Sequence, residues 1–380
     1  MANIFQLPET KPSALERFGL YYLNFFRKRD LTHTVFDFTD EELARKIKKI
    51  TIKGILLSAM TGILLVFPTV WVDVYFTEEP WYIHYGWVAA VTLVSILIEF
   101  YLLFIIALKA VYEVSDIINM QANPKEFLQS GVFSVKNILA RTALELPDPE
   151  LKILGIDPFK RISKKNLLVL GLIYKAKIFV TNFVIKYGLK FSVGETIFGV
   201  SILYEALFVE AFWNGVVLKR VVHEARLRLF GFALANHIAD SIIKNKQLQV
   251  LSPEAEVGCM RAIGNAVVMT QNYHPNMILL LLEFQQLLNL SDENKYDDWN
   301  LFLEVLQKVS EKERNFLLDL FTVSVAFDGK VSKLEQENLR AAYGKDFELY
   351  YPRLLQLTEH LKAGRLNAAY KLCRLDFVAG

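Results

Sequence analysis

The stretch GILLSAMTGILLVFPTVWV (residues 54–72) decides the fold class, because it runs for five helical turns without a charged residue. A helix of this length spans about 28 Å, close to the hydrocarbon thickness of a bilayer. Basic residues precede the stretch (Lys46, Lys48, Lys49 and Lys53) and acidic residues follow it (Asp73, Glu78 and Glu79). The sequence therefore predicts a membrane-spanning helix that begins on the cytoplasmic side.

A second apolar stretch runs from about Tyr85 to Leu108 after a short acidic and aromatic link. Only Glu99 interrupts it, and Lys109 closes it on the cytoplasmic side. The two stretches together predict an antiparallel membrane hairpin with tryptophan and tyrosine at its outer end. A carboxylate such as Glu99 near mid-membrane either takes part in a proton or cation step or pairs with a basic residue for assembly.

Three small residues of the first span lie four apart, namely Gly54, Ser58 and Gly62. Residues at this spacing share one face of a helix, and small side chains there let a second helix approach closely. The pattern predicts that this face is a helix-packing surface.

Two further apolar stretches, Leu167–Tyr187 and Val193–Leu218, predict a second hairpin and so a total of four spans. The first of them contains Lys175 and Lys177, and the second contains Glu205 and Glu210. Buried charges are costly in lipid, so we expect the lysines and glutamates to face protein and to pair across the helices. The alternative is an amphipathic helical hairpin that lies on the membrane surface.

The remaining parts of the chain read as cytoplasmic helices, so the fold class is all-α. Residues 1–50 have capping-box spacings and an aromatic helix face that either lies in the membrane interface or packs on the protein. The predicted divisions are 1–50, a first hairpin over 51–111, a connector over 112–165 with a helix over 126–144, a second hairpin over 166–220, and a helical domain over 221–380.

The composition limits the classes of function. The 380 residues are 53% hydrophobic, and a net charge of +2 does not fit a dedicated nucleic-acid binder. Cys259 and Cys373 are far apart and form no CxxC pattern, which indicates a reducing compartment. The sequence contains no Walker lysine motif, GxSxG or Rossmann glycine pattern, and its histidines are scattered. We therefore expect no enzyme and no catalytic residue.

The stretch LLDLFTVSVAFDGKVSKLEQENL (residues 317–339) resembles the signature of TerB-like domains, an all-helical family named from tellurite resistance. The resemblance implies that Asp328 and Glu335 contribute to a divalent-metal site for Ca²⁺ or Mg²⁺. The alternative is structural, with Gly329 forming the turn and Ser332 and Glu335 capping the next helix. A matching stretch from Ala262 carries Gln271 and Asn272 in place of Asp-Gly, which departs from the family pattern.

The stretch from Arg141 to Phe183 and the segment WNGVVLKRVVHEARLRLFG from Trp213 resemble a bacterial family of integral membrane proteins with no assigned activity. That resemblance implies a multi-pass protein of the bacterial cytoplasmic (inner) membrane with both termini in the cytoplasm.

These patterns favour a non-enzymatic membrane scaffold or sensor whose TerB-like domain binds a protein partner, and a divalent metal if the site is complete, in envelope or metal stress. Its other expected partners are the lipid bilayer and further copies of itself. The alternative is a small ion or solute transporter or channel that uses the intramembrane glutamates and lysines.

Overall fold

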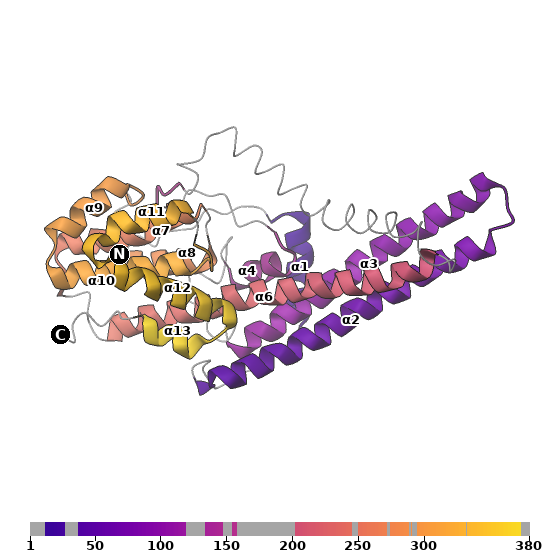
Figure 1. Cartoon of the computed structure of the whole chain (residues 1–380), viewed down its shortest axis with the longest axis horizontal. Helices are drawn as coiled ribbons and strands as arrows, with labels where there is room; N and C mark the ends of the chain where they lie inside the picture. The colour runs from indigo at the N-terminus through magenta and orange to yellow at the C-terminus, as the bar shows by residue number, and fades with distance from the viewer. Residues whose placement is uncertain are drawn as a thin grey trace.

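The computed structural model describes residues 12–26, 37–118, 134–146, 154–157, 202–244, 250–271, 274–288, 290, 295–331 and 333–373, without the side chains of 202–209, 243–244 and 333–334. Every regular element in these ranges is a helix and none is a strand, so the predicted all-α class is confirmed. Figure 1 shows a body of short helices at one end and a long helical hairpin that extends away from it.

The hairpin consists of α2 (Asp40–Tyr75) and α3 (Trp81–Ile117). Thr39 begins α2 with the predicted capping box, in which Glu42 and Thr39 satisfy each other's backbone N–H groups. Both helices are long and apolar enough to cross a membrane. Only 22% of the most apolar window of α3 is buried, whereas the core helix of a soluble protein is mostly buried. A large apolar surface is therefore exposed on the hairpin.

Two of the described helices, and not the four predicted, are long and apolar enough to span a membrane. The predicted span over residues 167–187 lies outside the described residues. The described part of the predicted span over 193–218 belongs to α6 (Ile202–Lys244), which does not meet the same criterion. Its glutamates and the basic residues from Lys219 onward interrupt the apolar run.

Helix α6 is continuous over 43 residues, a length of about 65 Å. Its N-terminal part packs on α2 and α3, and its C-terminal part packs on α8 and α12. No helix end falls at the division predicted between residues 220 and 221. The chain there, KRVVHEARL, contains no glycine, proline or capping residue that would end a helix.

Two short helices, α1 (Ala14–Phe25) and α4 (Val135–Ala143), pack on each other and on α3. Glu16 of α1 forms a buried ion pair with Arg141 of α4, with Oε1 and Nη2 2.5 Å apart. On the aromatic face of α1, Phe18 stacks edge-on against Tyr101 of α3, whereas Phe25 is 80% exposed. One part of that face therefore packs on the protein.

The helix predicted over 126–144 begins later than expected. Ser134 caps α4 by accepting the backbone N–H of Asn137, so the helix starts at Val135. Residues 119–133 lie outside the described ranges.

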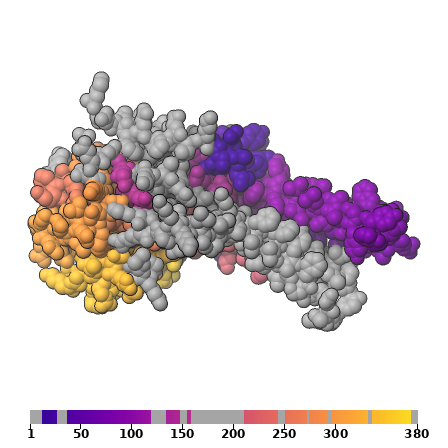
Figure 2. All heavy atoms as spheres, turned by 90° about the horizontal axis from the view of Figure 1, so that it is seen from above, coloured from indigo at the N-terminus to yellow at the C-terminus, as the bar shows by residue number. Residues whose placement is uncertain are grey.

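The helical body follows α6. It comprises α7 (Pro253–Thr270), α8 (Pro275–Leu288), α9 (Trp299–Lys308), α10 (Glu311–Ala326), α11 (Lys333–Tyr343), the 3₁₀ helix η4 (Gly344–Asp346), α12 (Phe347–Ala363) and α13 (Leu366–Leu372). Helices α7 and α10 pack together at its centre and are mostly buried. Glu313 closes the capping box of α10 and also accepts the backbone N–H of Ser252, which caps α7, at 2.7 Å. One carboxylate thus joins the starts of both central helices. Seen from above, the hairpin projects beyond this body (Figure 2).

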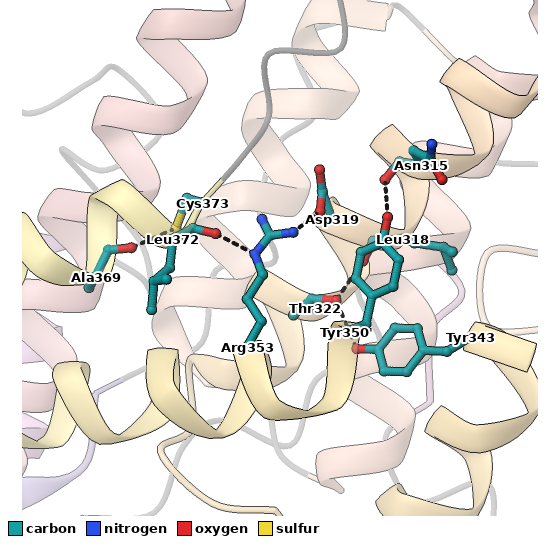
Figure 3. A network of polar contacts seen from close by, with 10 residues as sticks. All are labelled: Asn315, Leu318, Asp319, Thr322, Tyr343, Tyr350, Arg353, Ala369, Leu372 and Cys373. Carbon is teal, nitrogen blue, oxygen red and sulfur yellow. Dashed lines mark hydrogen bonds and ion pairs between the residues drawn. The ribbon is translucent and has the colours of Figure 1, made fainter. Parts of the chain in front are cut away.

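A buried polar network holds the end of the described chain in place (Figure 3). Arg353 of α12 pairs with Asp319 of α10, and its Nε donates to the carbonyl of Leu372 at 2.6 Å. Beside it, the hydroxyl groups of Thr322 and Tyr343 lie 2.8 Å apart. The guanidinium therefore links α10, α12 and α13, which fixes the position of α13.

Candidate functional site between the hairpin and the long helix

A buried hydrogen bond joins α3 to α6. The side-chain amide of Asn214 donates to Oε1 of Glu99 at 2.6 Å, and both residues are only 3% exposed. Glu99 thus meets an amide donor on a neighbouring helix and does not face the outside of the hairpin. Hydrogen bonding of this kind lowers the cost of burying a carboxylate.

Glycine on α2 makes room for this arrangement. A Cβ added at Gly62 would lie 2.6 Å from Nδ2 of Asn214 and 3.1 Å from Cγ of Glu210. Both residues are on α6, and Glu210 is itself buried. The side chains of Asn214 and Glu210 therefore occupy the space that a larger residue would fill.

The same face of α2 continues toward the N-terminal end of that helix. A Cβ at Gly54 would collide with the side chain of Leu218, and a Cβ at Gly215 would lie 3.1 Å from Ile55. Gly62 is thus opposite residue 210 and Gly54 opposite residue 218, so α2 and α6 run antiparallel. Residues 210–218 of α6 lie beside the uncharged part of α2.

Ser58 lies between these two glycines. It is completely buried, and its hydroxyl has no hydrogen-bond partner among the described residues. Gly54, Ser58 and Gly62, which the sequence places on one helix face, all lie against α6 or within its contact surface with α2.

The structure places only part of the predicted set of intramembrane charges. Glu99 and Glu210 lie at the junction of α2, α3 and α6, where Glu99 accepts the hydrogen bond from Asn214 and Glu210 lies four residues before Asn214 on α6. Lys175 and Lys177 lie outside the described residues, and so does the side chain of Glu205. The predicted Lys–Glu pairing is therefore outside what the structure describes.

Asn214 is a site residue that the sequence analysis did not single out. The available signal was its spacing of four from Glu210, which puts both on one face of α6. Glu99, Glu210 and Asn214 form a cluster of carboxylate and amide groups between three helices. Such a cluster can fix helix register through hydrogen bonds, and its carboxylates can bind a proton or a cation.

The second candidate site is the turn after α10. Oδ1 of Asp328 accepts the backbone N–H of Lys330 at 2.8 Å, and Gly329 has a φ of 71°. Only glycine adopts this conformation without strain, and the turn packs on Leu227 of α6. These contacts are those of the structural alternative weighed for Asp328.

The electrostatics of this turn are unusual. Burial raises the pKa of Asp328 to about 7, the charge of Glu335 acts in the same direction, and the Lys330 N–H opposes it. Glu335 is buried as well, and its negative charge raises the pKa of Asp328. Among the described residues, no group of three or more histidine, cysteine, aspartate or glutamate side chains is arranged to hold a metal ion.

The turn after α7 differs from the turn after α10. Gln271, the residue directly after α7, lies in the left-handed region with a φ of 54°, whereas Phe327, the residue directly after α10, is right-handed and the positive φ comes two residues later at Gly329. Both α7–α8 and α10–α11 are nevertheless helix–turn–helix pairs. The sequence after α7 lacks the Asp-Gly pair, and the residue that follows α7 has a different backbone conformation from the residue that follows α10.

The chain matches no family model, no curated protein and no solved structure.

Proposed function

We propose that the protein is a non-enzymatic, membrane-anchored scaffold or sensor of the bacterial cytoplasmic membrane. In this proposal α2 and α3 cross the bilayer, and the helical body binds a protein partner in the cytoplasm. The large exposed apolar surface of the hairpin supports membrane insertion, since soluble monomers rarely expose such a surface.

The continuity of α6 is the observation that carries this proposal. The helix contacts Gly62 and Gly54 of α2 through residues 210–218, and from Leu227 to Ile242 its buried residues belong to the core of the body. An unbroken helix transmits a displacement at one end to the other, because a sharp kink within it would break backbone hydrogen bonds. A scaffold or sensor needs such a connection.

The antiparallel contact of α6 with α2 bears on the number of spans. It places residues 210–218 beside the uncharged part of α2, on a helix that runs in the opposite direction. We propose that residues 167–187 and 193–218 form the second hairpin, which gives four spans and puts both termini in the cytoplasm. The buried positions of Glu210 and Asn214 reduce the cost of this placement.

The helical body is proposed to be a TerB-like domain that acts in envelope or metal stress. The helical architecture around the Asp-Gly turn is compatible with this resemblance. Asp328 and Glu335 would contribute oxygen ligands to Ca²⁺ or Mg²⁺, ions that need several such ligands. Self-association of the chain is compatible with the proposal.

A small ion transporter or channel is the second candidate function. The observation that favours it is the burial of two carboxylates, Glu99 and Glu210, at the junction of α2, α3 and α6. Buried ionisable groups inside a membrane often mark ion pathways. The hydrogen bond from Asn214 to Glu99 favours the scaffold, because it uses the carboxylate for assembly.

Ion flux into proteoliposomes that contain the full chain distinguishes the two functions. The scaffold predicts the same flux as empty liposomes. A flux that Glu99→Gln abolishes, and that the exposed-site control Glu348→Gln retains, would establish the transporter and overturn the scaffold.

Positive evidence for a partner would come from photo-crosslinking in cells. The probe would be placed at Leu349 or Leu355, exposed apolar residues of α12. The scaffold predicts one discrete crosslinked species from the helical body. A probe at the outer tip, for example at Trp81, should not give that species. Crosslinks that are equally diffuse from both sites would contradict the proposal.

A further inference from the structure

The exposed face of α2 changes from basic to apolar within about two helical turns. Arg45, Lys48, Lys49 and Lys53 form its basic part, and all four are exposed. The residues Ile52, Leu56 and Leu57 follow along the same side and are exposed as well. These seven side chains line a single shallow hollow on the surface of the helix.

The opposite face of α2 is buried against the protein. Leu43, Ile47 and Gly54 point inward, and the spacing of these residues is also helical. The hollow is therefore on the side of the helix that none of the described helices covers. In Figure 1 this end of α2 lies along the lower edge of the molecule.

The basic groups in the hollow are not all used within the protein. Nζ of Lys53 forms an ion pair with Oε1 of Glu113 at 2.8 Å. Arg45 lies one helical turn from Glu42. Lys48 and Lys49 have no acidic partner among the described residues. Two ammonium groups that line the hollow can therefore bind an anion.

We propose that this hollow binds an anionic phospholipid of the cytoplasmic leaflet. The phosphate would lie between Lys48 and Lys49, and an acyl chain would lie on Ile52, Leu56 and Leu57. A phospholipid joins a negative head group directly to a hydrocarbon chain, which matches the order of charge and apolar surface along α2. A free phosphate would match only the basic part. The inference rests on the proposed insertion of α2 into the membrane.

The experiment uses the full chain in nanodiscs of phosphatidylcholine with a minor fraction of phosphatidylglycerol. Native mass spectrometry counts the lipids of each kind that the released protein retains. Each basic residue near a membrane surface contributes about 1 kcal/mol to the attraction of an anionic lipid. Two such residues together correspond to roughly a thirtyfold effect, so we expect Lys48→Gln/Lys49→Gln to lower phosphatidylglycerol enrichment roughly thirtyfold.

The matched control is Lys345→Gln/Lys371→Gln, which removes the same charge from exposed positions of the helical body. It should retain the enrichment of the unmodified chain, as should the unmodified chain in excess inorganic phosphate. Circular dichroism checks that both double variants keep their helix content. Retention of the two lipids by the unmodified chain in the proportions of the nanodisc, equal loss of enrichment in both double variants, or displacement by phosphate would overturn the site.

Incorporation into the nanodisc separates the two proposals. A chain that enters the nanodisc without phosphatidylglycerol enrichment contradicts the lipid site alone. A chain that stays outside the nanodisc, and that alkaline carbonate removes from native membranes, contradicts membrane insertion and the lipid site with it.

Discussion

The carboxylate of Asp40 accepts the backbone N–H of Asn367 at 2.9 Å, although the two residues are 327 positions apart in the sequence. Its second oxygen accepts the N–H of Ala368 at 3.1 Å. Asp40 stands in the first turn of α2 and thereby caps the first turn of α13. The cap satisfies two amide groups that a helix start leaves without a partner. It also joins the hairpin to α13, the last described helix of the helical body.

Asp40→Ala should therefore destabilise α13 by about 1 kcal/mol, the usual cost of losing a helix cap. Hydrogen exchange of the full chain should show faster exchange at the amides of Asn367 and Ala368. Glu41→Ala is the matched control, since Glu41 is an exposed acid in the same turn of α2. Unchanged exchange in Asp40→Ala would contradict the proposed role of the cap.

Replacing Glu99 by leucine should remove the carboxylate oxygen that accepts the hydrogen bond from the buried Asn214 amide. We expect Glu99→Leu to cost about 1–2 kcal/mol, and Glu99→Gln to cost less because it keeps an acceptor oxygen. Unfolding in detergent measures both. The double variant Glu99→Leu/Asn214→Leu should cost less than the sum of the single variants, and strict additivity would argue against coupling of the two residues.

Alanine at Gly62 should destabilise the chain, whereas alanine at Gly86 should not. A Cβ at Gly62 meets Asn214 at 2.6 Å and the backbone of Glu210 at 3.3 Å, but a Cβ at Gly86 meets nothing within 4 Å. Both glycines are helical, so alanine at Gly86 gains about 0.5–1 kcal/mol of helix propensity. Thermal unfolding of the two variants checks the difference. Equal shifts would mean that α6 does not need a small residue at position 62.

The acid at the Asp-Gly turn predicts a pH dependence of stability. Because burial raises the pKa of Asp328 from 3.8 to about 7, the folded chain holds a proton there that the unfolded chain has released. The contribution of this group to stability is therefore greatest below about pH 4 and declines as the pH rises toward 7 and above.

Asp328→Asn keeps the side-chain oxygen that accepts the Lys330 N–H but cannot ionise. The stability of this variant relative to the unmodified chain should rise between about pH 4 and pH 7. Denaturant unfolding of the full chain across that range measures the difference. Parallel curves for the two proteins would show that the carboxyl group does not titrate in the folded state as described.

Much of the fold could be predicted from local patterns. The apolar runs gave the hairpin, and the spacings of Ser13 with Glu16, Thr39 with Glu42, and Ser310 with Glu313 correspond to capping boxes in the structure. These features depend on residues within a few positions of one another. Local sequence carries that information directly.

The contacts that position the candidate site could not be predicted from local sequence patterns. The bond between Asn214 and Glu99 and the cap of α13 by Asp40 join residues that are far apart in the chain, and no periodicity reports such contacts. The continuity of α6 was missed because the change from apolar to charged residues near Lys219 looks like the end of a span. The helix continues through this point, and only its packing partners change, from α2 to the helices of the body.

The continuity of α6 also bears on how such a protein can change over generations. A single helix serves as a packing partner for the hairpin over residues 210–218 and as a core element of the body from Leu227 onward. Inserting or deleting one residue between them would rotate one set of side chains by about 100° relative to the other. Recombination that exchanges the body for a foreign domain is therefore restricted to junctions that preserve helical phase, so hairpin and body are inherited as one unit.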